Sequence, residues 1–215
     1  MNWLAHFALS SEDDRERLGS WIPDLFPQSV LGSFRDPAIR RGMELHRLVD
    51  RVTDGHPAMW GARAALPPEL RRGGGIVLDV VWDHFLSREF PERTGRPLRP
   101  FVEEVLAGLE RVVVVAPPET AAVLQRMRQE DWLGSYGTAV GVEQTLERIS
   151  RRLSPRARQV LLPSRAADHL RDREEALRQA FDEVWRTVTQ AVAHWREQSQ
   201  DALSHPGGKG MNDER

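Results

Sequence analysis

One stretch of the sequence places an imidazole and two carboxylates four residues apart, at His46, Asp50 and Asp54. On an α-helix, each step of four residues turns the side chain by only about 40°, so the three groups form a row on one side of the helix. Imidazole nitrogens and carboxylate oxygens are suitable ligands for divalent metal ions. The spacing therefore indicates a candidate metal site on this segment.

A second stretch sets acidic residues among apolar ones. Asp79 and Asp83 are four residues apart in a segment of Ile, Val, Leu, Trp and Phe residues that must be mostly buried. Burial of a carboxylate without a partner is costly, so a metal ion, an arginine or a hydrogen-bond network must compensate. His84 lies about 100° around the helix from Asp83, so both could reach one cavity without lying side by side.

Near the N-terminus, His6 in an apolar segment and Asp24 after a Gly-Ser-Trp-Ile-Pro string add two further candidates. Each pattern also has a purely structural explanation. A lone histidine on an apolar face is more often a hydrogen-bonded core residue, and acids four apart are more often a solvated face. Arg47 could pair with Asp50 or Asp54, or it could bind a substrate phosphate. Because three such segments occur, a metal site and a structural role are about equally supported by spacing.

The elements that must position these residues are predicted to be helices. Pro37 after Asp36 is typical of a helix start, and apolar residues recur at helical spacing from there to Val52. Residues 76–86 are rich in β-branched residues, so a strand is an alternative, but the four-residue spacing of polar positions favours a helix. Further helices are predicted at residues 98–114, 118–133, 140–153 and 165–198, the last with room for one break.

This pattern predicts an all-α fold with a single-domain helical bundle over residues 1–200. Residues 201–215 are predicted to be a disordered tail, since the sequence there is rich in Gly and polar residues. We find no internal repeat and no linker that would divide the chain.

The composition excludes several classes of site and partner. The chain has no cysteine, which excludes disulfides, zinc–thiolate sites and cysteine nucleophiles. A net charge of −2 gives no global attraction to nucleic acid, and no apolar run approaches membrane-spanning length. Residues 73–75 are glycines without the lysine and hydroxyl of a phosphate-binding P-loop. With no signal-peptide pattern, we expect a cytoplasmic protein that binds neither nucleic acid nor membranes.

A cluster of arginines forms the main basic patch of the sequence. An ordinary role would be a solvated face in which arginine stabilises the C-terminus of a helix. The alternative is a docking surface for an acidic partner. The patch comprises Arg148, Arg151, Arg152, Arg156 and Arg158.

Four strings of this sequence resemble the acyl-carrier-protein phosphodiesterase family, whose members are relatives of the helical metal-dependent phosphohydrolases called HD domains. The strings occur in the order and spacing of that family, and the resemblance runs from residue 1 to roughly residue 195. They are Met1–His6, Gly19–Asp24, Leu45–Asp50 with Thr53 and Asp54, and Leu78–Leu86.

The resemblance implies an HD-domain-like fold and hydrolysis of the phosphodiester that joins 4′-phosphopantetheine to a serine of holo-acyl carrier protein, leaving the apo-carrier. It also implies a divalent metal, Mn2+ or alternatively Mg2+, and carboxylate-rich ligation with few histidines favours these ions over zinc. One or two ions would be held by some of the six candidate ligands. These are His6, Asp24, His46, Asp50, Asp83 and His84.

On the same interpretation, Asp79 orients or deprotonates the attacking water, and Arg47 offsets the charge that develops on phosphorus. Acyl carrier proteins are acidic, so we expect Arg151 and Arg152 to contribute to a basic docking face for the carrier.

Three positions around Asp24 depart from the family pattern, which has asparagine, alanine and phenylalanine where this chain has Ser20, Pro23 and Leu25. These changes affect the loop that carries Asp24 but keep the candidate ligand. Two alternatives therefore stay open. One is a related phosphohydrolase that acts on a nucleotide or another phosphodiester, and the other is a non-catalytic helical module that binds a carrier protein.

Overall fold

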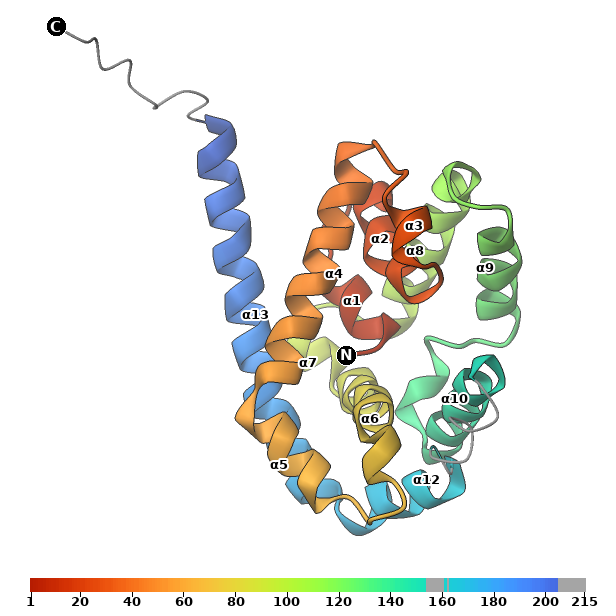
Figure 1. Cartoon of the computed structure of the whole chain (residues 1–215), viewed down its shortest axis with the longest axis vertical. Helices are drawn as coiled ribbons and strands as arrows, with labels where there is room; N and C mark the ends of the chain where they lie inside the picture. The colour runs from red at the N-terminus through yellow and green to blue at the C-terminus, as the bar shows by residue number, and fades with distance from the viewer. Residues whose placement is uncertain (154–160, 162, 205–215) are drawn as a thin grey trace, which may run out of the picture.

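The structure is a computed structural model that describes residues 1–153, 161 and 163–204. All regular elements among these residues are helices, packed into one bundle (Figure 1), so the predicted all-α fold is confirmed. The first half of the chain contains α1 (Trp3–Leu9), α2 (Asp14–Trp21), the 3₁₀ segment η1 (Ile22–Asp24), α3 (Gln28–Leu31), α4 (Pro37–Gly55), α5 (Pro57–Ala65), η2 (Arg71–Gly73) and α6 (Gly74–Arg88).

The second half continues with helices close to the predicted ranges, and the predicted final helix has one break, at Arg173. The last helix ends at Ser204, so residues 201–204, which are predicted to belong to the tail, are helical. Residues 205–215 lie outside the described part of the chain. The elements are α7 (Phe90–Thr94), α8 (Leu98–Val112), η3 (Val113–Val115), α9 (Glu119–Gln129), η4 (Ser135–Gly137), α10 (Ala139–Arg152), α12 (Pro163–Asp172) and α13 (Glu174–Ser204).

Helix α4 begins where the sequence predicts, with Pro37 in its first turn and Asp36 as its cap. The Asp36 carboxylate accepts hydrogen bonds from the backbone N–H groups of Ala38 and Ile39, at 2.9 and 3.2 Å. Such a cap satisfies amides that have no partner within the helix. The long helix that carries His46 is therefore fixed at its first turn.

Helices α2 and α4 approach each other so closely that two glycines are required at the crossing. A Cβ atom on Gly19 would lie 2.0 Å from the carbonyl oxygen of Ile39, and one on Gly42 would lie 2.0 Å from that of Glu16. Any larger residue at either position would force the backbones apart. This crossing brings the C-terminal end of α2 and the following η1 segment against the middle of α4.

Helix α6 occupies the interior of the bundle (Figure 1), and it resolves the choice between helix and strand for residues 76–86 in favour of a helix. Nearly every side chain from Val77 to Ser87 is buried, with Asp79 as the half-buried exception. A helix that is apolar on all sides needs neighbours on all sides. Burial by the surrounding helices thus outweighs the strand preference of its valines.

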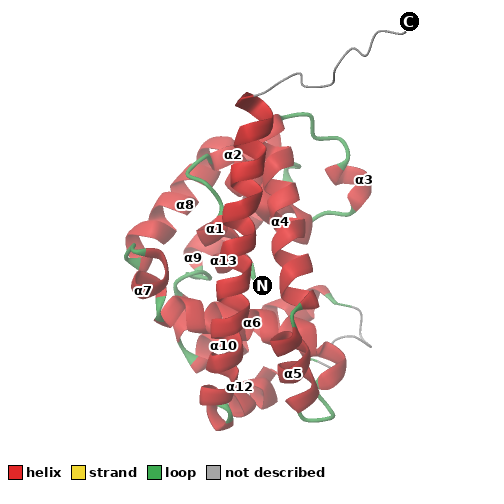
Figure 2. Cartoon of the chain, turned by 90° about the vertical axis from the view of Figure 1, so that its left-hand side faces the viewer, coloured by secondary structure: helices red, strands yellow, loops and turns green. Residues whose placement is uncertain are grey.

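Helix α13 runs alongside α4 and α5 and closes one side of the bundle (Figure 2). The Arg41 guanidinium stacks over the Trp195 ring at 4.9 Å, and His56 Nε2 lies 3.2 Å from the Thr187 hydroxyl. These contacts tie both ends of α4 to α13. Among the described residues, no helix is long and apolar enough to cross a membrane.

Candidate metal centre

Helix α1 is held in the bundle by a carboxylate of α6. Asp83 is fully buried, and its two oxygens accept hydrogen bonds from the backbone N–H groups of Leu4 and Ala5, at 2.8 and 3.2 Å. Burial raises the pKa of the Asp83 carboxyl to about 7, although these hydrogen bonds and the nearby Met1 amino group act to lower it. Asp83 thereby satisfies the free amides at the start of α1, the helix that carries His6.

His46 on α4 presents one ring nitrogen to two carboxylates. Its Nδ1 lies 2.9 Å from the carbonyl oxygen of Ser20, which can only accept a hydrogen bond, so Nδ1 carries a proton. The other nitrogen, Nε2, lies 3.0 Å from Asp50 Oδ2 and 3.8 Å from Asp24 Oδ1. A neutral His46 would direct a lone pair at these oxygens, so either a second proton or a cation must lie between them.

The pKa of His46 reflects this arrangement. Burial lowers the pKa, but the hydrogen bond to Asp50 and the charges of Asp24 and Asp50 outweigh burial and raise the pKa above its usual value. The Nδ1–H bond to a main-chain carbonyl is also the arrangement that fixes the tautomer of metal-bound histidines in proteins. His46 is therefore oriented to offer Nε2 to a cation.

His6 on α1 stacks against His46, with the ring centroids 4.2 Å apart. Its Nε2 lies 3.1 Å from the carbonyl oxygen of Met1 and 3.2 Å from Asp50 Oδ1. Its Nδ1 is buried and has no hydrogen-bond partner. Burial lowers the pKa of His6, which favours the neutral imidazole that a metal ion requires.

Asp24, in the η1 segment, is fixed by one oxygen and offers the other. The indole N–H of Trp3 donates to Asp24 Oδ2 at 2.9 Å. Pro23 sits within the first two residues of η1, where its fixed backbone angle suits a helical turn. The departure from the family pattern at this position thus fits the local helix and leaves Asp24 Oδ1 facing His46.

Asp50 joins the two imidazoles, since its Oδ1 lies 3.2 Å from His6 Nε2 and its Oδ2 lies 3.0 Å from His46 Nε2. Burial raises the pKa of Asp50, but hydrogen bonding to His46 and His6 outweighs burial and holds the pKa well below its usual range. Asp50 is therefore ionised at neutral pH and supplies negative charge to the cluster.

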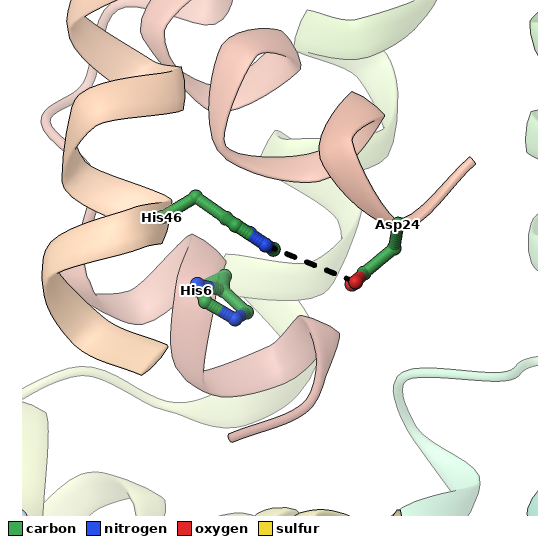
Figure 3. A group of neighbouring side chains, drawn as sticks. All are labelled: His6, Asp24 and His46. Atoms are coloured by element: carbon green, nitrogen blue, oxygen red, sulfur yellow. Dashed lines mark ion pairs between the residues drawn. The ribbon is translucent and has the colours of Figure 1, made fainter. Parts of the chain in front are cut away.

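Ligand atoms of His6, Asp24 and His46 all lie within 4.8 Å of one another (Figure 3). Among the described residues, these three form the group of nitrogen and oxygen donors close enough to share an ion, and Asp50 contacts both imidazoles. The crowding of His46 Nε2 against two carboxylates, one of which also contacts His6 Nε2, is a polar feature that a cation would satisfy. The residues therefore fit a divalent metal ion.

Two other predicted residues on α6 have different partners. Asp79 Oδ1 lies 2.9 Å from the amino nitrogen of Met1, which also lies 3.9 Å from Asp50 Oδ1. Burial lowers the pKa of the Met1 amino group, but the charges of Asp79 and Asp50 outweigh it and raise the pKa to about 10. His84 Nδ1 lies 2.8 Å from the Tyr136 carbonyl oxygen, and burial lowers the pKa of His84.

Two of the predicted arginines, Arg47 and Arg151, lie at the surface. Arg47 follows His46 on α4 and is exposed, as is Asp54 two turns further along the helix. Arg151 on α10 is 74% exposed and lies 4.0 Å from Glu147. For Arg152 the structure describes the backbone alone, and the predicted basic residues Arg156 and Arg158 lie outside the described residues.

A cavity of about 240 Å³ adjoins the cluster and shares Asp24 with it. Asp79 and the first three residues of the chain line the same space. A smaller cavity of about 30 Å³ continues from it, since both are lined by Asn2, Trp3 and Ile149. The candidate ligands thus lie beside a space that a small-molecule group could enter.

Sequence reasoning missed three contributors to the site. The Ser20 carbonyl orients His46, the Trp3 indole orients Asp24, and the Met1 amino group pairs with Asp79. A main-chain carbonyl leaves no trace in the sequence. Trp3 gave a signal, since it lies in a string with His6, but an aromatic residue in an apolar segment is usually core.

The sequence is similar to proteins from several bacteria that are named acyl carrier protein phosphodiesterase. The protein from Pectobacterium atrosepticum is 31% identical over 151 residues, which cover 70% of this chain and 78% of that protein. That from Serratia proteamaculans is 33% identical over 137 residues, covering 63% and 70%. That from Salmonella newport is 31% identical over 153 residues, covering 71% and 79%.

No solved structure matches the fold. The sequence profile of the family described as acyl carrier protein phosphodiesterase matches residues 1–188, which include every residue of the cluster. The chain therefore belongs to the acyl carrier protein phosphodiesterase family.

Proposed function

We propose that this protein is a metal-dependent phosphodiesterase that removes 4′-phosphopantetheine from holo-acyl carrier protein and leaves the apo-carrier. The proposal rests on one observation: His6, Asp24 and His46, from three separate segments, bring their ligand atoms within 4.8 Å of one another. The names of the relatives support the phosphodiester class and the carrier-protein substrate.

The cluster suits a divalent cation held by His6, Asp24, His46 and Asp50. Two carboxylates among four candidate donors favour manganese, with magnesium as the alternative. When bound, such an ion supplies positive charge that polarises a phosphate oxygen and lowers the pKa of water. The Ser20 carbonyl keeps His46 in the tautomer in which Nδ1 is protonated and the lone pair of Nε2 can bind a metal ion.

The remaining steps fall to Asp79 and Arg47. Asp79 lines the cavity and is half-buried, and its Oδ1 already accepts a hydrogen bond from the Met1 amino group. Its Oδ2 is the oxygen that we propose orients the attacking water and accepts its proton. Arg47, exposed beside His46, would offset negative charge on the phosphate.

For Asp83 and His84, both predicted as ligands, we propose a structural role instead. Both oxygens of Asp83 accept hydrogen bonds from α1, and His84 Nδ1 faces the Tyr136 carbonyl. Neither belongs to a group of neighbouring donors of the kind that His6, Asp24 and His46 form, among the residues described. Each holds a segment that lines the site.

An acidic carrier protein requires a docking face near the cavity. Arg151 is exposed on α10, two residues from each of the cavity-lining residues Ile149 and Leu153. We propose that Arg151 and Arg152 contact acidic side chains of the carrier. A carrier protein of fatty-acid synthesis as substrate would place the enzyme in the cytoplasm.

The test is to incubate the protein with holo-acyl carrier protein and Mn2+ and to follow the carrier by mass spectrometry. The expected result is loss of the whole phosphopantetheine group, abolished by a chelator and restored by Mn2+. His46→Ala should abolish the reaction, whereas His194→Ala, which changes an exposed histidine on α13, should not.

Two outcomes would contradict the proposal. Hydrolysis of nucleotide phosphodiesters with no effect on the holo-carrier would favour the related phosphohydrolase. Binding of the carrier without mass loss, at any metal concentration, would favour the non-catalytic module. In the latter case the purified protein should also hold no stoichiometric metal, which elemental analysis would establish.

A further inference from the structure

The cavity beside the metal cluster is lined by both ionisable and aliphatic residues. Asp24, Asp79 and the Met1 amino group supply the ionisable groups of its lining. The lining also includes an aliphatic wall, which we define as Ile76 and Val80 of α6 with Ile149 and Leu153 of α10. A ligand that matches this lining combines a charged group with an uncharged, largely apolar chain.

The dimensions of the cavity point to a narrow ligand. Its volume of about 240 Å³ is below the roughly 300–1,000 Å³ of pockets that enclose drug-sized molecules. No arginine or lysine belongs to its described lining, and the Met1 amino group there is already paired with Asp79, so the lining offers no unpaired cation for a second phosphate. These features disfavour a nucleotide with several phosphates and favour a single phosphodiester with a slender uncharged arm.

Asn2 lies where the two cavities meet. Its side-chain N–H donates to the Tyr136 hydroxyl at 3.0 Å, which leaves its carbonyl oxygen Oδ1 to accept another hydrogen bond. Asn2 caps α1 by position but makes no side-chain cap hydrogen bond. The Asn2 side chain is thus held by Tyr136 and does not cap the helix, and its oxygen can accept a hydrogen bond from an amide N–H of a ligand.

The pantetheine arm has the matching chemistry. Next to its phosphate it carries two methyl groups and a hydroxyl, followed by two amides separated by methylenes, and it ends in a thiol. Beyond the phosphate it is uncharged and thin. Resting on the proposed function, we propose that this cavity binds the arm, with Asn2 Oδ1 accepting a hydrogen bond from an arm amide and the aliphatic wall contacting its methyl and methylene groups.

The proposal makes Ile149 a specificity-determining residue, because it lines both cavities and is half-buried. Ile149→Trp should fill the space without adding charge. We expect its affinity for free 4′-phosphopantetheine, measured by calorimetry on the full chain with Mn2+, to fall at least about tenfold. Its kcat/KM for holo-acyl carrier protein should fall further than that for a short chromogenic phosphodiester that lacks the arm.

Two companion variants control for folding. Val140→Trp makes the same kind of substitution on α10 at a side chain that is 62% exposed and outside both cavities, and it should behave as wild type. Asn2→Leu removes the acceptor oxygen while keeping the number of side-chain heavy atoms. It should raise KM for the holo-carrier by about three- to tenfold, the value of one hydrogen bond. Circular dichroism would verify that each variant is helical.

The outcomes separate this inference from the proposed function. If the wild type hydrolyses the holo-carrier, while Ile149→Trp and Asn2→Leu bind 4′-phosphopantetheine within about twofold of wild type, the arm does not bind here and the function stands. If the wild type binds 4′-phosphopantetheine in a manner sensitive to Ile149 but releases none from the carrier, the binding site stands and the function fails. Absence of both binding and hydrolysis would overturn both.

Discussion

On α4, His46 and Asp50 face other ionisable side chains, namely His6 and Asp24. On α6, Asp79 and Asp83 face nitrogens of the N-terminal segment, the amino group of Met1 and two backbone amides of α1. Both helices carry polar residues four apart, and both rows lie near α1. The two rows differ in the groups that contact their side chains.

This difference indicates how to separate a site from a scaffold. Asp83 has an N–H donor for each oxygen, so it needs nothing further. His46 Nε2 lies between two carboxylates, so the α4 row is complete only with an added proton or cation. A polar side chain whose hydrogen bonds are all made within the protein indicates a structural role. A group of acceptor atoms that face one another without a donor between them indicates a cation site.

The largest predicted effect tests the α4 row. His46→Ala removes a ligand atom and should lower kcat/KM for the holo-carrier by at least about 100-fold, because loss of mere outer-shell partners costs about 10–100-fold. The measurement is the initial rate of phosphopantetheine release at saturating Mn2+. Activity within a few-fold of wild type would show that the cluster does not carry the reaction.

The matched change on α6 should instead reduce stability. Asp83→Ala leaves two buried N–H groups of α1 without an acceptor, which should cost about 2–4 kcal/mol of unfolding free energy. Asp83→Asn keeps one acceptor oxygen and should cost less. Urea unfolding followed by circular dichroism measures the loss. If Asp83→Ala were as stable as wild type yet inactive, Asp83 would be a ligand after all, and the comparison between the helices would be wrong.

Metal affinity should depend on pH through His46. The pKa of His46 is raised in the metal-free protein, so at pH 6 the ring holds a proton that a cation must displace. Affinity for Mn2+ should therefore rise with pH by up to about tenfold per unit until the pH exceeds that pKa. Calorimetric titrations at pH 6, 7 and 8 measure the slope. His84→Gln on α6 should leave this pH dependence of Mn2+ affinity unchanged. If the pH dependence vanished in His84→Gln, the metal would be bound by α6, and its assignment to α4 would be wrong.

The raised pKa of His46 also determines how the stability of the metal-free protein changes with pH. Because the folded pKa of His46 lies above its unfolded value, its contribution is fully present below about pH 6.5 and is lost as pH rises through the folded pKa. The metal-free protein should then lose this contribution toward alkaline pH, whereas bound Mn2+ adds stability by mass action. Thermal unfolding with and without a chelator, at pH 6 and 8, should show the larger metal effect at pH 8.

Periodicity predicts the helices well, because each buries an apolar face at a spacing that is visible in the sequence. It also predicts that His46 and Asp50 share a side of α4. It does not predict which polar row becomes the site, since that depends on the close crossing of Gly19 and Gly42 and on the Ser20 carbonyl. These are contacts between distant backbones, and spacing along one helix does not encode them.

The smallest predicted effect concerns how the carrier reaches the α4 row. Arg151→Glu reverses a charge on the exposed side of α10, close to the cavity. We expect kcat/KM to fall by about three- to tenfold at low salt and the difference to shrink as added salt screens the surface charges. Arg99→Glu is the control, because Arg99 is similarly exposed and also pairs with an acid, Asp131, on another part of the surface. Equal losses of kcat/KM in Arg151→Glu and Arg99→Glu would show that net charge alone causes the loss. An unchanged kcat/KM in the double variant Arg151→Glu/Arg152→Glu would show that α10 is not part of the docking face. A loss specific to α10 would place the carrier beside α10, the helix that contributes Ile149 and Leu153 to the aliphatic wall.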